Sequence, residues 1–400
     1  MVTFYVGHPG CQRTQAKALR KVDGVRLWHF DAVGDPDAVD GVSQLLWRLA
    51  DAQAAAGHEV TLFCRSELTD AARRRCDLSD LRVVPMSRSL RNHPPHRVID
   101  AAGPAPDLGI VHSAWLPYHA AVARTLRRRG IPYATISHGG HTPALLEASP
   151  VRRRLYLRLV ERPTVWRAVG AVYAGEAERA EAERLFGEPV PRAGVAPFPA
   201  AAPTGGEPGW RFDDTAPSVM YLGRYDVFQK GVDDLCEVAR RLPDVPFDLY
   251  GEPPHAADAL AAFSIVRDAA PANVAFRGPV IGDEAKAGCF ARARIYLQYS
   301  RFEGFPLSVT EALAAGVPVA CADRLPFARE LAEQGAALLV SSDPRTAARE
   351  LGELLDDRVT LEGLSARGVA YARNRNDVER IAERHLELYA EMLAATAGAA

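Results

Sequence analysis

The stretch that decides the fold runs from Phe302 to Val319 and reads FEGFPLSVTEALAAGVPV. It places two carboxylates, those of Glu303 and Glu311, eight positions apart. The apolar run just before it, residues 295–299, predicts a buried strand, and the spacing after it predicts a helix that begins near Pro306 and ends at a glycine. The loop between strand and helix therefore lies at the carboxyl end of a parallel strand, where open α/β sheets bind ligands.

Composition excludes several classes of protein. The 400 residues suit two domains, and a hydrophobic content of 48% is enough for two cores. A net charge of −2 gives no indication of nucleic-acid binding. The six cysteines form no C-x-x-C pair or metal-ligand spacing, so we expect a reducing, cytoplasmic location and no bound metal. The amino terminus lacks the form of a signal peptide, and no apolar run is long enough to predict a membrane span.

Strand and helix patterns alternate in two series, which predicts two doubly wound parallel sheets with helices on both faces, facing each other across a cleft. The first series predicts strands at Val25–Phe30, Val60–Cys64, Leu81–Pro85, Leu108–His112, Pro132–Ser137 and Ala168–Ala174, with Thr3–Val6 as an additional candidate. The second series predicts strands at Ser218–Leu222, Phe247–Tyr250, Val274–Phe276, Ile295–Tyr299, Val317–Ala320 and Ala336–Val340. A Pro- and Gly-rich break separates them, so we expect domains at 1–196 and 217–376, a linker at 197–216 and a final helix within 377–400.

A pair of cations follows the first strand of the second series. Arg224 offers a guanidinium fork and Lys230 a point charge, and both suit phosphate oxygens. Lys230 is one of only four lysines among 48 basic residues, so it stands out in a chain that otherwise uses arginine. The alternative is that both are solvated surface cations.

The start of the helix near Pro306 is a second candidate for binding an anion. Its free N–H groups and positive dipole end point into the same loop region, and Gly304 lets the backbone approach a ligand closely. Glu311 lies among apolar residues and needs hydrogen-bond donors, which ribose hydroxyls would supply. Alternatively, Ser308 and Glu311 match the S-x-x-E pattern of a capping box, although Pro306 favours a helix start two residues earlier.

The first series offers weaker candidates. His138 follows a predicted strand beside two glycines and could touch a substrate, although a lone histidine of this kind is more often structural. Gly41 opens the clearest helix, which ends at Gly57, and its N–H could bind an anion; an ordinary Asp40 N-cap is the alternative. Residues 152–160 combine arginines with apolar and aromatic residues, which suits either an anionic membrane surface or a solvated helix face.

With these motifs, the chain resembles the retaining glycosyltransferases of the GT-B fold, specifically family 4. The resemblance rests on the E-x₇-E segment from Glu303 to Glu311 with its Glu-Gly-Phe-Pro core, and on Gly223-Arg224 with Lys230-Gly231 upstream. The His138 and Gly41 loops match more weakly, and Asp40 stands where family members often have a first glycine. The order of elements agrees over nearly the whole chain. The absence of a G-x-G-x-x-G motif argues against a nicotinamide cofactor.

The resemblance implies two Rossmann-like domains and a UDP- or GDP-type nucleotide-sugar donor held mainly by the second, with no metal and no further cofactor. It implies that Arg224 and Lys230 bind the diphosphate, that Glu303 contacts sugar hydroxyls and that Glu311 binds the ribose. It also implies that the donor site includes Gly304, Phe305, Leu307, Ser308 and the Gly41 loop, that His138 lies near the transferred sugar, and that the final helix, within 377–400, crosses back onto the first domain.

We therefore expect a cytoplasmic hexosyltransferase that moves a sugar to a hydroxyl acceptor, either a small natural product or a cell-envelope or polysaccharide precursor. Catalytic residues would be Glu303, His138, Arg224 and Lys230. Acceptor contacts would come from residues 31–41, 86–97 and 113–119, and residues 152–160 would allow weak membrane contact. Two alternatives stay open: a non-catalytic sugar-nucleotide-binding partner protein and a sugar-nucleotide epimerase of the same two-domain build.

Overall fold

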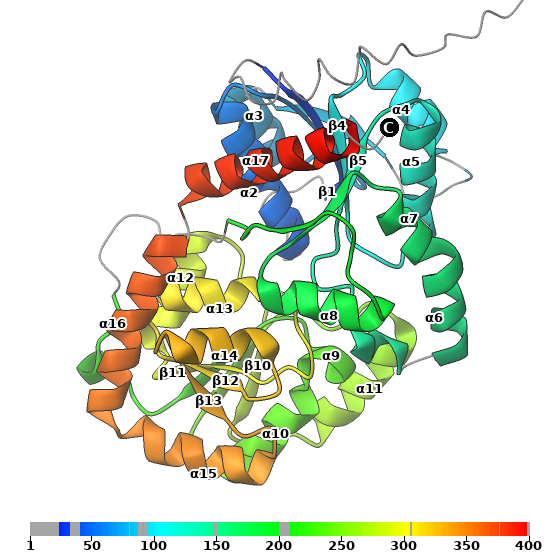
Figure 1. Ribbon diagram of the computed structural model, residues 1–400. Coiled ribbons are helices and arrows are strands. Elements are labelled where there is room, and N and C mark those ends of the chain that lie inside the picture. Colours follow the sequence, from blue (N-terminus) through cyan, green and yellow to red (C-terminus); the bar gives the residue numbers. More distant parts are fainter. Residues whose placement is uncertain are drawn as a thin grey trace, which may run out of the picture. The chain divides into compact units, whose positions relative to one another are not determined.

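The computed structural model describes residues 24–32, 41–79, 81–86, 91, 94–147, 150–199, 209–304, 306–375 and 377–397. The chain divides into two units (Figure 1). The first is Met1–Pro199 with Val378–Ala400, and the second is Ala200–Asp377. The candidate strand Thr3–Val6 lies outside the described residues. No helix in the described part of the chain is both long and apolar enough to cross a membrane.

The first unit is built on one parallel sheet with the strand order β3-β2-β1-β4-β5-β6-β7. Its strands are β1 (Arg26–Ala32), β2 (Glu59–Cys64), β3 (Arg82–Pro85), β4 (Leu108–His112), β5 (Tyr133–Ile136), β6 (Gly170–Tyr173) and β7 (Ala193–Val195). The central strands are buried on both faces, which is why they read as continuous apolar runs. The sequence did not predict β7, because three residues with a central glycine carry almost no strand signal.

The helices of the first unit cover this sheet. They are α2 (Gly41–Ala55), α3 (Asp70–Ser79), α4 (Pro95–Ala101), α5 (Pro117–Arg128), α6 (Pro150–Tyr156), α7 (Arg162–Trp166), α8 (Glu176–Phe186) and α17 (Val378–Ala397), with a 3₁₀ turn at Pro143–Leu146 and a π-helix at Leu157–Glu161. The last helix, α17, packs beside α2 and against β6 (Figure 1). The chain's carboxyl-terminal segment is thus part of the first unit's core.

The second unit has a six-stranded parallel sheet with the order β10-β9-β8-β11-β12-β13. Its strands are β8 (Val219–Leu222), β9 (Phe247–Tyr250), β10 (Val274–Gly278), β11 (Ile295–Gln298), β12 (Val319–Ala322) and β13 (Ala337–Val340). Its helices are α9 (Val227–Lys230), α10 (Val232–Arg240), α11 (Ala257–Asp268), α12 (Asp283–Arg292), α13 (Leu307–Ala314), α14 (Pro326–Glu333), α15 (Pro344–Leu355) and α16 (Arg358–Arg375), with a 3₁₀ turn at Phe212–Asp214. Trp210, inside the predicted linker, is buried in this unit and donates from Nε1 to the Ala293 carbonyl at 2.9 Å.

Both sheets confirm the predicted α/β class with doubly wound parallel strands. In each sheet the chain winds outward in one direction for three strands and then returns to the centre for the fourth. The direction changes between β1 and β4 in the first unit and between β8 and β11 in the second. Loops that follow such strand pairs diverge and leave a crevice at the carboxyl edge, which is the usual ligand position in this class of sheet.

Candidate functional site

The candidate site of the second unit lies where β8 and β11 end. Lys230 is carried by the loop and short helix after β8, and Glu303 by the loop after β11. Their side chains meet, with Lys230 Nζ 2.6 Å from Glu303 Oε1. The lysine side chain is 16% exposed and the glutamate side chain 5% exposed. The predicted cation and the predicted carboxylate therefore form one partly buried ion pair at the point where the winding direction changes.

A helix cap and a glycine turn fix the backbone around Lys230. Asp226 caps α9 by accepting a hydrogen bond from the Gln229 N–H at 2.7 Å. Gly231 follows with a φ of 64°, a left-handed conformation that favours glycine. A Cβ at this position would lie 2.9 Å from the Tyr299 carbonyl oxygen, so only glycine lets the two loops approach this closely.

Glu303 is held by three donors that meet at one oxygen. Besides Lys230, the Gln298 Nε2 donates to Glu303 Oε1 at 2.9 Å and the Ser300 Oγ donates at 2.6 Å. The Tyr296 hydroxyl lies 2.7 Å from Gln298 Oε1 and so orients that amide. A buried carboxylate with this many donors is fixed in position without a ligand's help.

The helix α13 begins at Leu307, directly after Pro306. Ser308 is therefore the second residue of the helix rather than its cap, so the capping-box interpretation is wrong, for the reason that Pro306 itself indicated. The Ser308 Oγ lies 2.8 Å from the Tyr296 hydroxyl. Its backbone N–H is among those at the start of a helix that have no partner within the helix.

Glu311 has a partner that the sequence did not reveal. Lys286, from α12, places Nζ 2.9 Å from Glu311 Oε1, and the two side chains are 10% and 5% exposed. Lys286 therefore supplies one of the donors that this buried carboxylate needs, and binding of ribose hydroxyls by Glu311 stays a prediction. Removing only one partner of such a buried ion pair lowers the stability of the fold, because the other charge is left buried and unpaired.

Arg224 lies on the surface of the same loop region. Its side chain donates to Gln229 Oε1 at 3.2 Å, and its carbonyl accepts from the buried Tyr221 hydroxyl at 2.9 Å. The backbone of Arg224 is thus anchored while its guanidinium stays exposed. Gly304 follows Glu303 in the same loop, Leu307 is the first residue of α13, and Phe305 lies outside the described residues.

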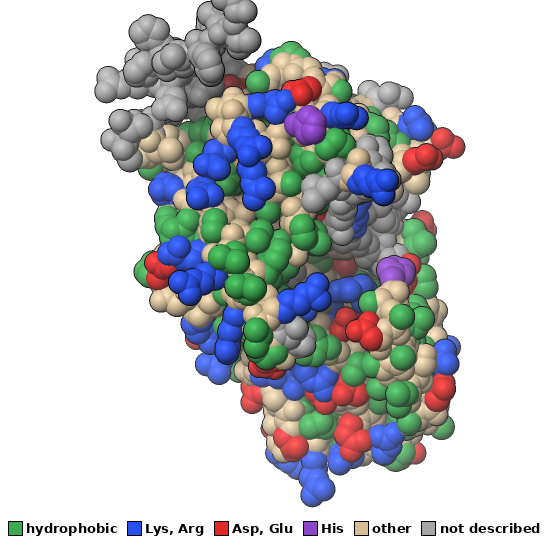
Figure 2. Space-filling model, turned by 90° about the vertical axis from the view of Figure 1, so that its right-hand side faces the viewer, with side chains coloured by type: hydrophobic (Ala, Val, Ile, Leu, Met, Phe, Trp, Pro, Cys, Tyr) green, Lys and Arg blue, Asp and Glu red, His purple; other side chains and the backbone are tan. Residues whose placement is uncertain are grey.

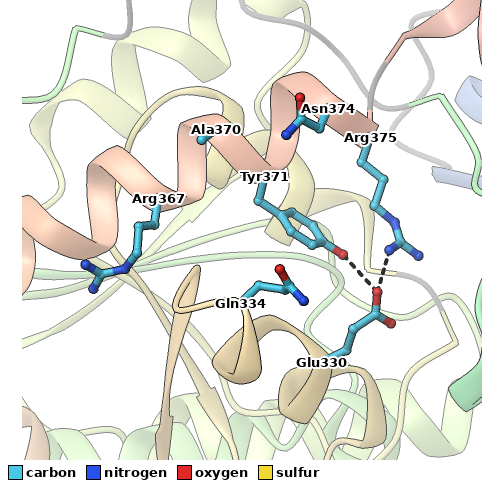
Figure 3. Close-up of a pocket in the computed structure, with 7 residues that line it drawn as sticks. All are labelled: Glu330, Gln334, Arg367, Ala370, Tyr371, Asn374 and Arg375. Carbon is cyan, nitrogen blue, oxygen red and sulfur yellow. Dashed lines mark hydrogen bonds and ion pairs between the residues drawn. The ribbon is translucent and has the colours of Figure 1, made fainter.

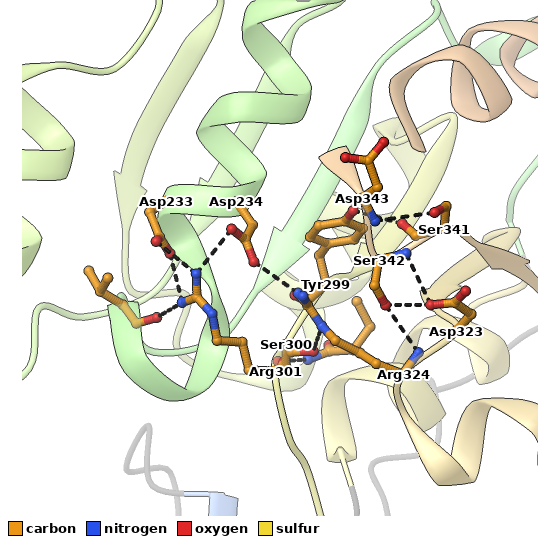
Figure 4. A network of polar contacts seen from close by, with 12 residues as sticks. Asp233, Asp234, Tyr299, Ser300, Arg301, Asp323, Arg324, Ser341, Ser342 and Asp343 are labelled. Carbon is orange, nitrogen blue, oxygen red and sulfur yellow. Dashed lines mark hydrogen bonds and ion pairs between the residues drawn. The ribbon is translucent and has the colours of Figure 1, made fainter. Parts of the chain in front are cut away.

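Two arginines join the loop after β11 to the start of α10 (Figure 4). Arg301 donates through both terminal nitrogens to Asp233, at 2.9 and 2.8 Å, and its backbone N–H donates to the Gln229 carbonyl at 2.8 Å. Arg324 donates from Nε to the Ser300 carbonyl at 2.9 Å. It also donates to the Tyr299 carbonyl at 2.6 Å and to Asp234 at 3.1 Å. The network fixes the distance between the loop that carries Lys230 and the loop that carries Glu303.

The first unit holds His138 at the end of a buried chain of side chains. His138 Nε2 lies 2.8 Å from His112 Nδ1, and His112 Nε2 lies 2.9 Å from His29 Nδ1. At the other end of this row of side chains, His29 Nε2 lies 2.8 Å from the Gln53 amide oxygen. His29 is on β1 and His112 on β4, the strands between which this sheet changes direction, and His138 follows β5.

Burial determines the protonation state of the two histidines inside this row of hydrogen-bonded side chains. It lowers the pKa of His29 to about 4 and the pKa of His112 well below its usual value, so both rings are neutral at pH 7. The Gln53 carbonyl oxygen only accepts, so His29 carries its proton on Nε2, and His112 must then donate from Nε2 to His29. His138 in turn donates from Nε2 to His112 Nδ1. These hydrogen bonds therefore fix the orientation of the His138 ring.

Backbone conformations mark the same edge of the first sheet. Among the described residues, five other than glycine have positive φ, and four of them lie in the last two residues of β1 or in the loops after β4 and β5: Asp31, Ser113, Trp115 and His138. The Asp31 side chain is fully buried, with Arg65 Nη1 at 3.5 Å and His119 Nε2 at 3.4 Å. Strained conformations of this kind collect at ligand sites. Gly41, the first residue of α2, lies in this unit as well.

A cavity of about 440 Å³ lies elsewhere in the second unit, between α14 and α16 (Figure 3). Its carboxylate, Glu330, is already bonded to the Tyr371 hydroxyl at 3.3 Å and to Arg375. The other lining side chains include Gln334 and Asn374 but no second carboxylate and no lysine. Its two arginines, Arg367 and Arg375, already donate to the Gly335 carbonyl and to Glu330, and the cavity is lined by the ends and faces of helices rather than by the carboxyl ends of strands, so we do not take it as the candidate site.

Family comparison agrees with this division of the chain. Residues 216–357 match the model of the family Glycosyl transferases group 1, and residues 40–201 match the Glycosyl transferase 4-like domain. No curated protein sequence matches the chain.

Solved structures share the fold at low sequence identity. A sucrose-phosphate synthase from Thermosynechococcus elongatus has a TM-score of 0.73 and 19% identity, covering 93% of this chain and 100% of its own. HepE from Anabaena, in complex with UDP and glucose, has a TM-score of 0.69 and 16% identity, covering 91% and 98%. AviGT4, a glycosyltransferase involved in avilamycin A biosynthesis, has a TM-score of 0.61 and 20% identity, covering 92% and 98%. Two glycosyltransferase domains on this shared fold assign the chain to the GT-B glycosyltransferases.

Proposed function

We propose that the protein is a retaining glycosyltransferase of family 4 that transfers a sugar from a UDP- or GDP-type donor to a hydroxyl acceptor without a metal ion. One observation carries the proposal. The Lys230–Glu303 pair lies at the carboxyl edge between β8 and β11, beside the start of α13. It joins a cation, a carboxylate and free helix N–H groups, which are the three kinds of group that a sugar diphosphate requires.

The chemistry assigns a role to each group. When the bond between the anomeric carbon and the phosphate oxygen breaks, its electron pair stays on the diphosphate and positive charge develops on the sugar. Lys230, Arg224 and the N–H groups near Leu307 and Ser308 stabilise the first of these charges. An ammonium group has three hydrogens, so Lys230 can donate to a phosphate oxygen while it stays bonded to Glu303.

Glu303 and Glu311 would bind hydroxyl groups of the donor. Glu303 presents a carboxylate whose first oxygen is fixed by Lys230, Gln298 and Ser300, so its second oxygen is oriented for sugar hydroxyls. Glu311, oriented by Lys286, would accept from the ribose. The HepE complexes with UDP, glucose and UDP-glucose support a uridine donor as the first to test.

The first unit would bind the acceptor. His138, whose ring is oriented by its Nε2 contact with His112, would lie near the transferred sugar. Asp31 and residues 113–119 lie at the same edge of the sheet and match two of the three acceptor regions that the sequence indicated. Retention of configuration is consistent with attack of the acceptor on the face that the phosphate leaves, with the phosphate taking the acceptor's proton.

The test is a thermal-shift panel of UDP- and GDP-sugars on the purified protein, followed by product analysis with the stabilising donor. We expect one donor to raise the unfolding temperature and to yield a glycoside with the donor's anomeric configuration by proton NMR, in the presence of EDTA. Inversion of configuration would contradict the retaining mechanism, and loss of turnover in EDTA would contradict metal independence. Donor binding without transfer or hydrolysis would favour a binding protein, and isomerised donor without acceptor would favour an epimerase.

A further inference from the structure

A stripe of apolar side chains is exposed on α6 and the π-helix that follows it. Val151, Leu155 and Leu159 are 83%, 58% and 63% exposed, and they lie four positions apart along the helix. At that spacing they share one face. Leu155 and Leu159 gain nothing from this position in a helix that faces only water, so the face is suited to an apolar partner.

Arginines border this stripe. Arg152, Arg154 and Arg158 are exposed on the same segment, and no carboxylate in the described part of the chain bonds to them. The only acid among residues 150–161 is Glu161, which is buried and accepts from the Trp115 N–H and faces His141 Nε2 at 2.9 Å. The positive charge of this helix is therefore presented outward and is not paired with a carboxylate among the described residues of the unit.

A small cavity lies against the same segment, between α5, the π-helix and α7. Its volume is about 50 Å³, and its lining includes Leu159 together with Arg124, Arg127 and Arg167. Within the described ranges none of these three guanidinium groups bonds to a carboxylate. One water needs only about 10–15 Å³ of such volume, so the cavity has room for a phosphate group. Three arginines around one cavity are a recognised way to bind a phosphate.

We propose that this face of the first unit, made of α5, α6, the π-helix and α7, docks onto an anionic phospholipid bilayer. The leucines and Val151 would enter the boundary between headgroups and acyl chains, the bordering arginines would contact lipid phosphates, and the cavity would hold one phosphate of a headgroup. Figure 2 shows a face of the molecule on which hydrophobic side chains lie next to Lys and Arg side chains.

Charge and apolarity together favour a bilayer over a nucleic acid or a protein. A nucleic-acid surface would combine arginines with few exposed aliphatic side chains, whereas here the aliphatic stripe is central and the arginines border it. The whole chain has a net charge of −2, so attraction to an anionic surface must come from this local patch. The proposal does not depend on the proposed transfer reaction.

The test is co-sedimentation of the full chain with vesicles of 7:3 phosphatidylcholine and phosphatidylglycerol, compared with phosphatidylcholine alone. We expect binding to the anionic vesicles, about tenfold weaker binding to the neutral ones, and release at high salt. The double variant Leu155→Ser/Leu159→Ser and the triple variant Arg124→Gln/Arg127→Gln/Arg167→Gln should each weaken binding at least tenfold. These side chains are exposed, so the unit's core stays intact.

The matched controls come from the second unit. Val359→Ser and Ile265→Ser remove exposed apolar side chains, and Arg349→Gln removes an exposed arginine. If these controls weaken vesicle binding as much as the first-unit variants, or if wild-type protein stays in solution with anionic vesicles at low salt, the proposal fails. Protection of the protein by soluble glycerol phosphate with no binding to vesicles would also overturn it, because the cavity would then serve a free phosphate compound.

Discussion

Lys230 Nζ lies 2.6 Å from Glu303 Oε1, across 73 positions of sequence. The two residues come from the loops after β8 and β11, which the strand order places side by side. The pair converts two weak sequence signals into one site, because a lysine side chain that is only 16% exposed meets a buried carboxylate that already has two neutral donors.

Glu303→Gln should abolish transfer and leave the fold intact. The amide keeps the shape of the side chain and can still accept from Lys230, but it loses the negative charge that orients the ammonium and binds sugar hydroxyls. We expect the rate of transfer to fall about 10²–10³-fold, with an unfolding temperature near that of wild type. Steady-state kinetics checks this expectation, with Glu353→Gln, an exposed residue on α15, as the matched control. Full activity would remove Glu303 from the mechanism.

Lys286 and Glu311 should behave as a coupled pair. Lys286→Met alone leaves the Glu311 carboxylate buried without its cation, and we expect a loss of about 3–5 kcal/mol in the free energy of unfolding. The double variant Lys286→Met/Glu311→Leu should recover most of this loss, because it buries no charge.

Urea unfolding of the two variants measures the pair's stability, and nucleotide titration separates it from binding. If Glu311 binds ribose, the double variant stays stable but loses nucleotide affinity. A double variant that is stable and binds normally would show that the pair is structural only.

Arg324→Lys should reduce catalysis more than stability. Lysine keeps the charge but cannot donate together to the Ser300 and Tyr299 carbonyls and to Asp234. The loop that carries Glu303 would shift, and a small displacement of a catalytic group costs roughly 10-fold or more in kcat/KM. The exposed Arg349→Lys is the control. An unchanged kcat/KM in Arg324→Lys would show that the network of Figure 4 does not position the site.

The first unit should lose stability as pH falls below neutrality. Burial lowers the pKa of His29 and of His385 from 6.5 to about 4, and it lowers the pKa of His112 well below its usual value. Below pH 6.5 the unfolded chain takes up protons that the folded unit excludes, so stability present above pH 6.5 is lost on approach to pH 4. Each histidine contributes a slope of up to about 1.4 kcal/mol per pH unit.

Urea unfolding at several pH values, followed by tryptophan fluorescence, measures this slope. His385→Gln keeps a donor for the Pro197 carbonyl, which His385 Nε2 faces at 3.0 Å. The variant should reduce the dependence of unfolding free energy on pH by the contribution of one histidine. The exposed His96→Gln should leave it unchanged. Equal slopes in wild type and His385→Gln would contradict the assignment.

Sequence alone predicts the two sheets well because their strands are buried on both faces. Runs such as Leu108–His112 and Phe247–Tyr250 have the same bounds in the structure as in the prediction. Lys230 and Glu303 could be singled out because each lies in a loop directly after such a strand. Two features of the site, a lysine before a glycine and an E-x₇-E segment, are each formed by residues close together in the sequence. They can therefore be recognised without knowledge of the tertiary structure.

The residues that support the site could not be read in the same way. Lys286 reaches Glu311 from another helix, and Arg301 and Arg324 look like any arginine in a chain rich in that residue. His29 and His112 each resemble a lone core histidine, and only the parallel register of β1 with β4 aligns them with His138. Pairing across strands depends on tertiary structure, which no local pattern records.

The most direct test of the central claim is calorimetric titration of the full chain with UDP and GDP, on wild type and on Lys230→Ala, with Arg349→Ala as the control. If the Lys230–Glu303 pair is the diphosphate site, one nucleotide binds wild type and the control alike, and Lys230→Ala weakens it at least roughly tenfold, since a charged hydrogen bond is lost. Equal affinity of wild type and Lys230→Ala for that nucleotide would place the diphosphate elsewhere and contradict the account.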